Sequence, residues 1–263
     1  MPLTIPSSEA RRAGPEYRAG RGWWMVAALG LSVVLGGFLV AQFRAGRTLL
    51  VMALIVQASL ILILMPPFVS TILSGRHWSI ELRYGFLRAG HLALKGTWLS
   101  VQAALAVLAA SLVIPISALL RLGSSVDLTV LLWSEVYLGL VAVVVGEITV
   151  LFSSLSISSF RSLSWIYVTL VVATGLVVFV VPVDQTSKPL IDFALLTSPL
   201  IAVSAIWRFD ILRTEWAYTQ LQLGHYRFTY PSPFECLGVV TVAAVAVFLL
   251  TILLLRSRLR PLN

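Results

Sequence analysis

Two glutamates interrupt the most apolar part of this chain. Glu135 and Glu147 are the only charged residues between positions 128 and 160. Charged side chains are costly inside a membrane segment, and those that occur there commonly serve ion pathways, proton relays or substrate sites. On one helix, twelve residues separate the two carboxyls by about 120° around the axis and about 18 Å along it, so they cannot act as one pair. Each is a separate candidate for a transport role, and the alternative for each is a protonated or hydrogen-bonded structural carboxyl.

Residue types that carry other chemistry are few and badly placed for it. His77, His91 and His225 all fall outside the apolar runs. The sequence therefore offers no paired intramembrane ligands for haem or a metal, and no histidine for an intramembrane serine protease. The single cysteine, Cys236, cannot form an internal disulfide and has no cysteine partner for a metal site. We expect no catalytic residues, no metal and no cofactor.

One segment superficially resembles a phosphate-binding loop. Residues 90–97 have the order Gly-x4-Lys-Gly-Thr, whereas such a loop has Gly-x4-Gly-Lys-Thr and follows a β-strand. Here the segment leads into an apolar run, so we interpret the match as chance. The chain is not expected to be an enzyme, and any ATP hydrolysis is expected on a separate subunit.

The elements that position the two glutamates are predicted to be membrane helices. The chain is 59% hydrophobic and only 11% charged, with a mean hydropathy of +0.95, whereas an ordinary soluble domain is roughly 25% charged. Spanning about 30 Å of hydrocarbon takes roughly 20 apolar residues. We predict an all-α, polytopic membrane protein in which residues 1–263 form one transmembrane domain. Its six expected spans are 22–43, 48–75, 96–120, 129–152, 163–183 and 236–255.

A shorter apolar segment precedes the last span. Residues 193–207 are uncharged but include Pro199, and a helix of this length reaches only about 22 Å. It is too short to cross a bilayer, so we expect a re-entrant or interfacial helix. Residues 208–233 mix aromatic and charged side chains, which is typical of short amphipathic helices at a membrane surface. The sequence thus predicts short extracytoplasmic helices between spans 5 and 6.

Basic residues orient the predicted spans. With six spans, twelve of the nineteen Lys and Arg residues fall on the side that holds both termini, and the positive side of a membrane protein is normally cytoplasmic. The net charge of +8 is explained by this distribution, and nucleic acid is not an expected partner. Tryptophans near expected span ends fit an aromatic belt at the bilayer surface; they are Trp23, Trp24, Trp98, Trp133 and Trp165.

The loop between spans 2 and 3 has the pattern of an amphipathic helix at the cytoplasmic surface. Apolar and aromatic side chains recur at helical spacing on one face, and charged side chains line another at steps of seven. The first face carries Ile80, Tyr84, Leu87, His91 and Leu94, and the second carries Glu81, Arg88 and Lys95. The alternative is a connector that rests on the membrane and binds no partner.

The whole layout resembles the permease subunits of ABC-2 type transporters. The resemblance lies in the order of a basic N-terminal segment, two spans, a charged cytoplasmic stretch with Glu81, Leu82 and a closing Lys95, and a long outer loop before the final span. Gly85 stands at the place of the family's Pro-Leu-Ser turn, and its Gly-Thr pair is absent here. Residues 198–200, Ser-Pro-Leu, are similar to the family's Asn-Pro-Leu before its outer helices.

The resemblance implies that the chain is one of two permease subunits of an exporter in a prokaryotic plasma (inner) membrane. Two permease subunits, as a homodimer or heterodimer, would each bind a separate ABC ATPase subunit from the cytoplasm. The stretch 75–95 would be the coupling element, and a second coupling loop would lie at 153–164. The coupling residues implied are Glu81, Arg83, Arg88, Lys95 and Arg161.

Two other functions stay open. A proton-coupled secondary carrier would use Glu135 or Glu147, but such carriers normally show inverted repeats and helices broken at matching positions. Pro66-Pro67 and Pro115 are expected to break spans 2 and 3, and the later spans have no counterpart. A non-catalytic scaffold or assembly subunit of a membrane complex would show the same helices.

Overall fold

The computed structural model describes seven stretches of the chain, and every element in them is a helix. The described residues are 15–42, 46–73, 89–122, 127–155, 165–170, 188–209 and 230–258. The all-α prediction is confirmed for these residues. Four of the expected coupling residues, Glu81, Arg83, Arg88 and Arg161, lie outside them.

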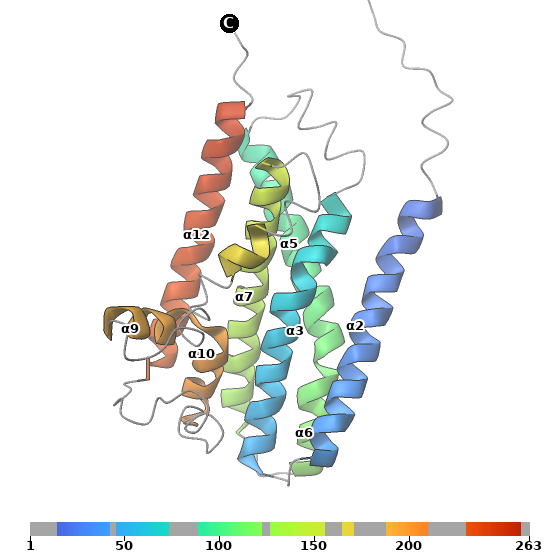
Figure 1. Ribbon diagram of the computed structural model, residues 1–263, viewed down its shortest axis with the longest axis vertical. Helices are drawn as coiled ribbons and strands as arrows, with labels where there is room; N and C mark the ends of the chain where they lie inside the picture. Colours follow the sequence, from blue (N-terminus) through green and yellow to red (C-terminus); the bar gives the residue numbers. More distant parts are fainter. Residues whose placement is uncertain are drawn as a thin grey trace, which may run out of the picture.

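Long helices form an upright bundle (Figure 1). They are α2 (Pro15–Gln42), α3 (Arg47–Leu73), α5 (Ala89–Ser111), α6 (Val113–Leu122), α7 (Leu128–Leu155) and α12 (Pro233–Arg258). Four candidate membrane spans are long and apolar enough to cross a bilayer, and they are Thr48–Leu73, Ala89–Leu122, Leu128–Leu155 and Pro233–Ser257. α2 covers the first expected span, where the structure gives a shorter apolar segment, Ala27–Leu39. The chain is therefore a membrane protein by the length and composition of these helices.

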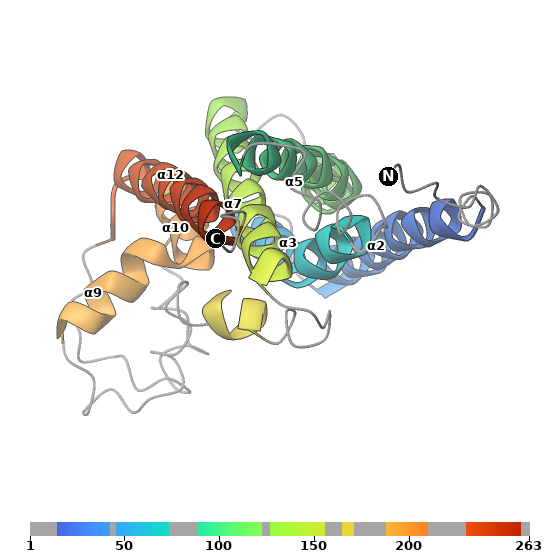
Figure 2. The same ribbon diagram turned by 90° about the horizontal axis from the view of Figure 1, so that it is seen from above.

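α7 occupies the centre of the bundle, packed against α3, α5, α10 and α12. From above, α2 lies at one edge of the bundle and α12 toward the other (Figure 2). Gly146 of α7 allows α5 to approach closely, since a Cβ built there would lie 2.7 Å from the Ser100 Cβ. Small residues commonly mark such close helix contacts in membrane proteins. The position of α7 gives its polar side chains access to several neighbouring helices.

The paired prolines do not break α3, and the expectation of a break there is wrong. α3 runs continuously from Arg47 to Leu73 with Pro66 and Pro67 inside it. Because proline has no N–H, Pro67 leaves the carbonyl of Ile63 without its usual helical donor. The hydroxyl of Tyr167 donates a hydrogen bond to that carbonyl at 2.7 Å. A neighbouring segment thus supplies the missing bond, which is how membrane helices tolerate proline.

The third expected span is broken, as Pro115 predicts. Its helices α5 and α6 are separated at Leu112, three residues before the proline. Pro115 cannot donate to the carbonyl of Ser111, the residue four positions earlier. The span also begins earlier than expected, because α5 starts at Ala89 and includes Lys95 rather than opening at Gly96. Leu92 and Ala93 are buried in the core, which favours continuing the helix through this stretch.

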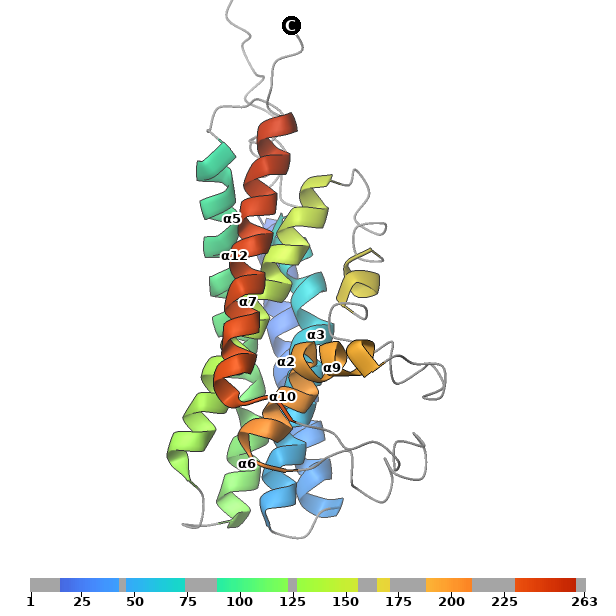
Figure 3. The same cartoon turned by 90° about the vertical axis from the view of Figure 1, so that its left-hand side faces the viewer.

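Two short helices precede the last span where the sequence predicts one. α9 (Lys188–Thr197) lies across the bundle and α10 (Pro199–Ile206) follows it after Ser198 (Figures 1 and 3). Proline at the first position of a helix is favourable, because its missing N–H has no helical partner there. Seven of the eight residues of α10 are buried, and it contacts α3, α7, α9 and α12. A short, buried, apolar helix, α10, lies within residues 193–207, and its re-entrant or interfacial position stays a prediction.

Four helix ends meet at one end of the bundle. One cavity is lined by Leu50 near the start of α3, Leu122 at the end of α6, Val130 near the start of α7 and Phe234 at the start of α12. α7 and α12 therefore begin at the same end and run in the same direction. Of the fifth expected span, 163–183, the structure describes only the helical segment 165–170.

Candidate functional site

Three polar side chains of α7 form hydrogen bonds to three different neighbours. The hydroxyl of Ser134 accepts a bond of 2.9 Å from the indole Nε1 of Trp207, which caps α10. Glu135 bonds α3 and Glu147 bonds α5. The helix that carries both sequence-predicted glutamates is thus tied to most of the bundle through polar groups.

Glu135 belongs to a buried cluster with Gln57 of α3 and Ser111 of α5. The Gln57 amide donates from Nε2 to Glu135 Oε2 at 3.0 Å and to Ser111 Oγ at 3.3 Å. Gln57 Oε1 and Glu135 Oε1 are both buried and have no partner among the described residues. Both atoms are acceptors, and buried acceptors without donors are costly. A proton on the carboxyl, a bound cation or a water molecule would supply what the cluster lacks, which is the chemistry of a proton or cation site.

The cluster lies where the third span is broken. Ser111 is the last residue of α5, and its backbone carbonyl has lost the helical donor at Pro115. The Ser111 hydroxyl donates to the carbonyl of Leu108 at 3.0 Å. The polar cluster therefore lies at the interruption that Pro115 causes in the third span.

Glu147 belongs to a second, separate cluster. Its Oε1 accepts a hydrogen bond of 3.1 Å from the hydroxyl of Thr97, and its Oε2 is buried without a partner among the described residues. Thr97 and Ser111 are both on α5, fourteen residues or about 21 Å apart along the helix. The two carboxyls therefore belong to separate clusters at different heights of the bundle, and α5 contributes a hydroxyl to each.

The segment that superficially resembles a phosphate-binding loop is helical. Residues 90–97 all belong to α5, and the Ser100 hydroxyl donates a hydrogen bond to the Gly96 carbonyl within the same helix. Lys95 is exposed in the second turn of α5. No group of three or more potential metal-binding side chains occurs within the described ranges.

Sequence reasoning found the glutamates but missed their partners. Gln57 and Thr97 are neutral polar residues in expected spans or at their ends, and hydropathy gives them little weight. One signal was available for Gln57, because it is the only side-chain amide in residues 48–75. An amide inside an uncharged span usually has a polar partner on another helix.

Comparison of the chain with protein-family models, with curated proteins and with solved structures finds no match.

Proposed function

We propose that this chain is the membrane-spanning permease subunit of an ABC-2 type exporter, working with a second permease subunit and a separate ATPase subunit. It would lie in a prokaryotic inner membrane with six spans and both termini in the cytoplasm. The observation that carries the proposal is the pair α9 and α10. Short helices ahead of the last span, one of them buried against α3, α7 and α12, fit the outer-helix arrangement that the sequence resembles.

The direction of the helices supports six spans. α7 and α12 start at the same end of the bundle, so the chain must return to that end between Leu155 and Pro233. Tyr167 bonds the Ile63 carbonyl, which is sixteen residues or about 24 Å into α3. A return span at 163–183 would start near this contact. α2 begins and α12 ends at one end of the bundle (Figure 1), and an even number of spans would place both termini on one side.

The coupling role is assigned to the stretch before α5. In the proposal Glu81, Arg83, Arg88 and Lys95 face the ATPase subunit, with Arg161 in a second loop. α5 runs from this stretch into the bundle and reaches both clusters through Thr97 and Ser111. A motion at the start of α5 would therefore be transmitted to Glu147 directly through Thr97, and to Glu135 through Ser111 and Gln57.

The proposal is tested by two measurements, the association of the chain with an ATPase and ATP-driven flux. The tagged chain is purified from its native membrane in detergent and assayed for ATPase activity that comigrates with it. Glu81→Lys with Arg88→Glu should release that activity and abolish ATP-driven flux in proteoliposomes. The matched control is Asp192→Lys with Arg256→Glu, which reverses two exposed charges outside residues 75–95 of the sequence. Unchanged association in the first variant would favour the scaffold alternative.

A second function has one observation in its favour. The Gln57, Ser111 and Glu135 cluster has two buried acceptors with no donor in the part of the chain that the structure describes, as expected of a site that takes up a proton. In a proton-coupled carrier, flux driven by a pH gradient alone should be lost in Glu135→Gln. In an ATP-driven exporter the same variant should retain ATP-driven flux, because energy enters through the partner subunit. The same pair of assays on Glu147→Gln tests the second cluster.

A further inference from the structure

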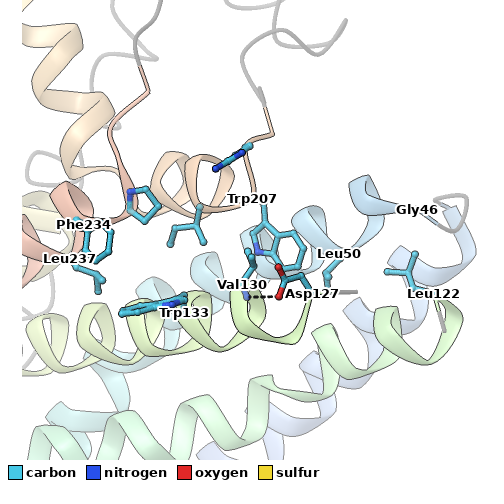
Figure 4. Close-up of a pocket in the computed structure, with 12 residues that line it drawn as sticks. Gly46, Leu50, Leu122, Asp127, Val130, Trp133, Trp207, Phe234 and Leu237 are labelled. Carbon is cyan, nitrogen blue, oxygen red and sulfur yellow. Dashed lines mark hydrogen bonds between the residues drawn. The ribbon is translucent and has the colours of Figure 1, made fainter. Parts of the chain in front are cut away.

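A cavity opens at the end of the bundle where α10 meets the starts of α3, α7 and α12. Its volume is about 770 Å³, within the range of pockets that bind small molecules. Figure 4 shows it as elongated, with Trp133 and Phe234 toward one end and Gly46 and Leu122 toward the other. The polar clusters of α7 do not line it.

In a bilayer crossed by the candidate spans, the cavity would lie where the hydrocarbon changes to headgroups. Leu50, Val130 and Leu237 line it, and each belongs to the first turns of a candidate span. Trp133 and Phe234 pack edge to face with ring centroids 6.2 Å apart, and both side chains are exposed on the bundle surface. Aromatic side chains at this depth contact lipid headgroups and the tops of acyl chains.

One wall carries a fixed carboxylate. Asp127 precedes α7, and its Oδ1 accepts hydrogen bonds from the backbone N–H groups of Thr129 and Val130 at 2.9 and 3.4 Å. This capping geometry holds the carboxylate at the cavity (Figure 4). The Trp207 ring beside it is fixed as well, because its Nε1 bonds Ser134. A carboxylate next to aromatic rings is favourable for an ammonium group.

The opposite charge comes from Arg208, which lines the same cavity. Arg208 has φ 49°, a backbone conformation that glycine normally adopts. It follows the cap of α10, where its N–H bonds the Ala205 carbonyl and the Phe209 N–H bonds the Ser204 carbonyl. Glycine is the usual residue at this position of such a motif. Arg208 lines the same space as Asp127, so a positively charged side chain borders the cavity, and a guanidinium binds a phosphate through charge-assisted hydrogen bonds.

We propose that this cavity binds the zwitterionic headgroup of a phospholipid, with the ammonium at Asp127 and the aromatic rings and the phosphate at Arg208. A purely anionic headgroup would meet Asp127, and a purely cationic one would meet Arg208. Trp133, Phe234 and Leu237 provide an apolar exit for the acyl chains into the bilayer. The site does not depend on the proposed transport function.

The test is headgroup-selective lipid retention. The full-length chain is reconstituted in nanodiscs with equal amounts of dioleoyl phosphatidylcholine and dioleoyl phosphatidylglycerol, transferred to detergent, and its bound lipids are counted by native mass spectrometry. Phosphatidylcholine should be retained preferentially. Asp127→Asn and Arg208→Gln should each lower its retention about tenfold, since each removes a charge-assisted contact, and Trp133→Leu about threefold. Asp192→Asn and Arg256→Gln are matched controls outside the cavity and should leave retention unchanged.

Two further experiments distinguish loss of the site from misfolding, and a bound lipid from a soluble headgroup compound. Arg208→Gly relieves the backbone strain, so it should fold at least as well as the wild type and still lose selective retention. Glycerophosphocholine in the detergent buffer should not displace the lipid, because it lacks the acyl chains. Displacement would show that the site takes a free headgroup compound and would overturn the lipid assignment. Equal retention of both lipids by the wild type, or equal loss in the controls, would overturn the site itself.

Discussion

α7 and α12 are similar in sequence character and opposite in environment. They contain 28 and 26 residues, and both are candidate spans. Both are strongly apolar, yet only 11% of the most apolar 18 residues of α12 are buried, compared with 61% for α7. In lipid there is little hydrophobic force between helices, because acyl chains are as apolar as leucine. Apolar character therefore does not decide which helix is central, and the helix whose polar side chains pair with other helices lies inside the bundle.

The polar side chains of α7 and α12 also differ in where their hydrogen-bond partners lie. Ser134, Glu135 and Glu147 of α7 bond residues of α10, α3 and α5. The described hydroxyls of α12, by contrast, bond α12 itself: Thr241 and Thr251 each donate to the carbonyl four residues earlier. α12 also begins with a reciprocal cap between Ser232 and Glu235. Hydroxyls of α7 such as Thr149 also bond their own helix, so the difference is that the two carboxyls of α7 and the Ser134 hydroxyl accept hydrogen bonds from other parts of the bundle.

The largest effect is expected at the glycines of the two helices. Gly146→Ala should lower the free energy of unfolding by about 3 kcal/mol, because the new methyl overlaps Ser100. Gly238→Ala in α12 should be neutral or slightly stabilising, since nothing lies within 4 Å of its built Cβ. Thermal unfolding in detergent, followed by gel filtration, measures both. Ser100→Gly should rescue Gly146→Ala, and failure to rescue would contradict the close-contact explanation.

The next largest difference in stability is expected between a buried leucine of α7 and an exposed leucine of α12. Leu138 of α7 is fully buried and Leu249 of α12 is 52% exposed. Leu138→Ala should cost about 2 kcal/mol through the cavity that it leaves. Leu249→Ala should change the free energy of unfolding by less than about 0.5 kcal/mol. Equal losses in the same unfolding assay would mean that α12 is covered in the membrane by a partner with specific packing.

The polar cluster of α7 should show a coupled effect. Gln57→Leu should cost about 2 kcal/mol, because Glu135 loses the hydrogen bond that Gln57 donates and stays within the bundle. Glu135→Leu in the Gln57→Leu background should recover part of that loss, since no unpaired carboxyl remains. A double-mutant cycle on thermal stability measures the coupling. Strict additivity would show that the bond contributes nothing.

The smallest effect is expected at the prolines of α3. Tyr167→Phe removes the donor to the Ile63 carbonyl and should cost about 1 kcal/mol. In a Pro67→Ala background the restored backbone N–H can bond that carbonyl, so the same change should cost almost nothing. A Tyr167→Phe loss that persists unchanged in this background would rule out the Pro67 explanation.

The sequence predicts more of the fold than of the site. Long apolar runs predict the four spans, and the length of residues 193–207 predicts that they do not cross. The expected break at Pro66 and Pro67 is absent, because the Tyr167 hydroxyl, a hundred residues away in sequence, satisfies a carbonyl that proline leaves free. The glutamates are recognisable as candidates because charges in spans are rare. Gln57 and Thr97 are not, because neutral polar residues occur in many spans without a polar partner.

The sequence by itself determines that this chain is a membrane protein, since the helices need only length and hydropathy to be recognised. It also determines that Glu135 and Glu147 cannot form one site, because helical geometry alone separates them. Only the tertiary structure decides which helix is central and which side chains form hydrogen bonds with the two carboxyls. It also decides that Asp127, Trp207 and Arg208 line one cavity. These properties depend on contacts between segments far apart in the chain, and helix packing in lipid is set by close fit and paired polar groups rather than by hydropathy.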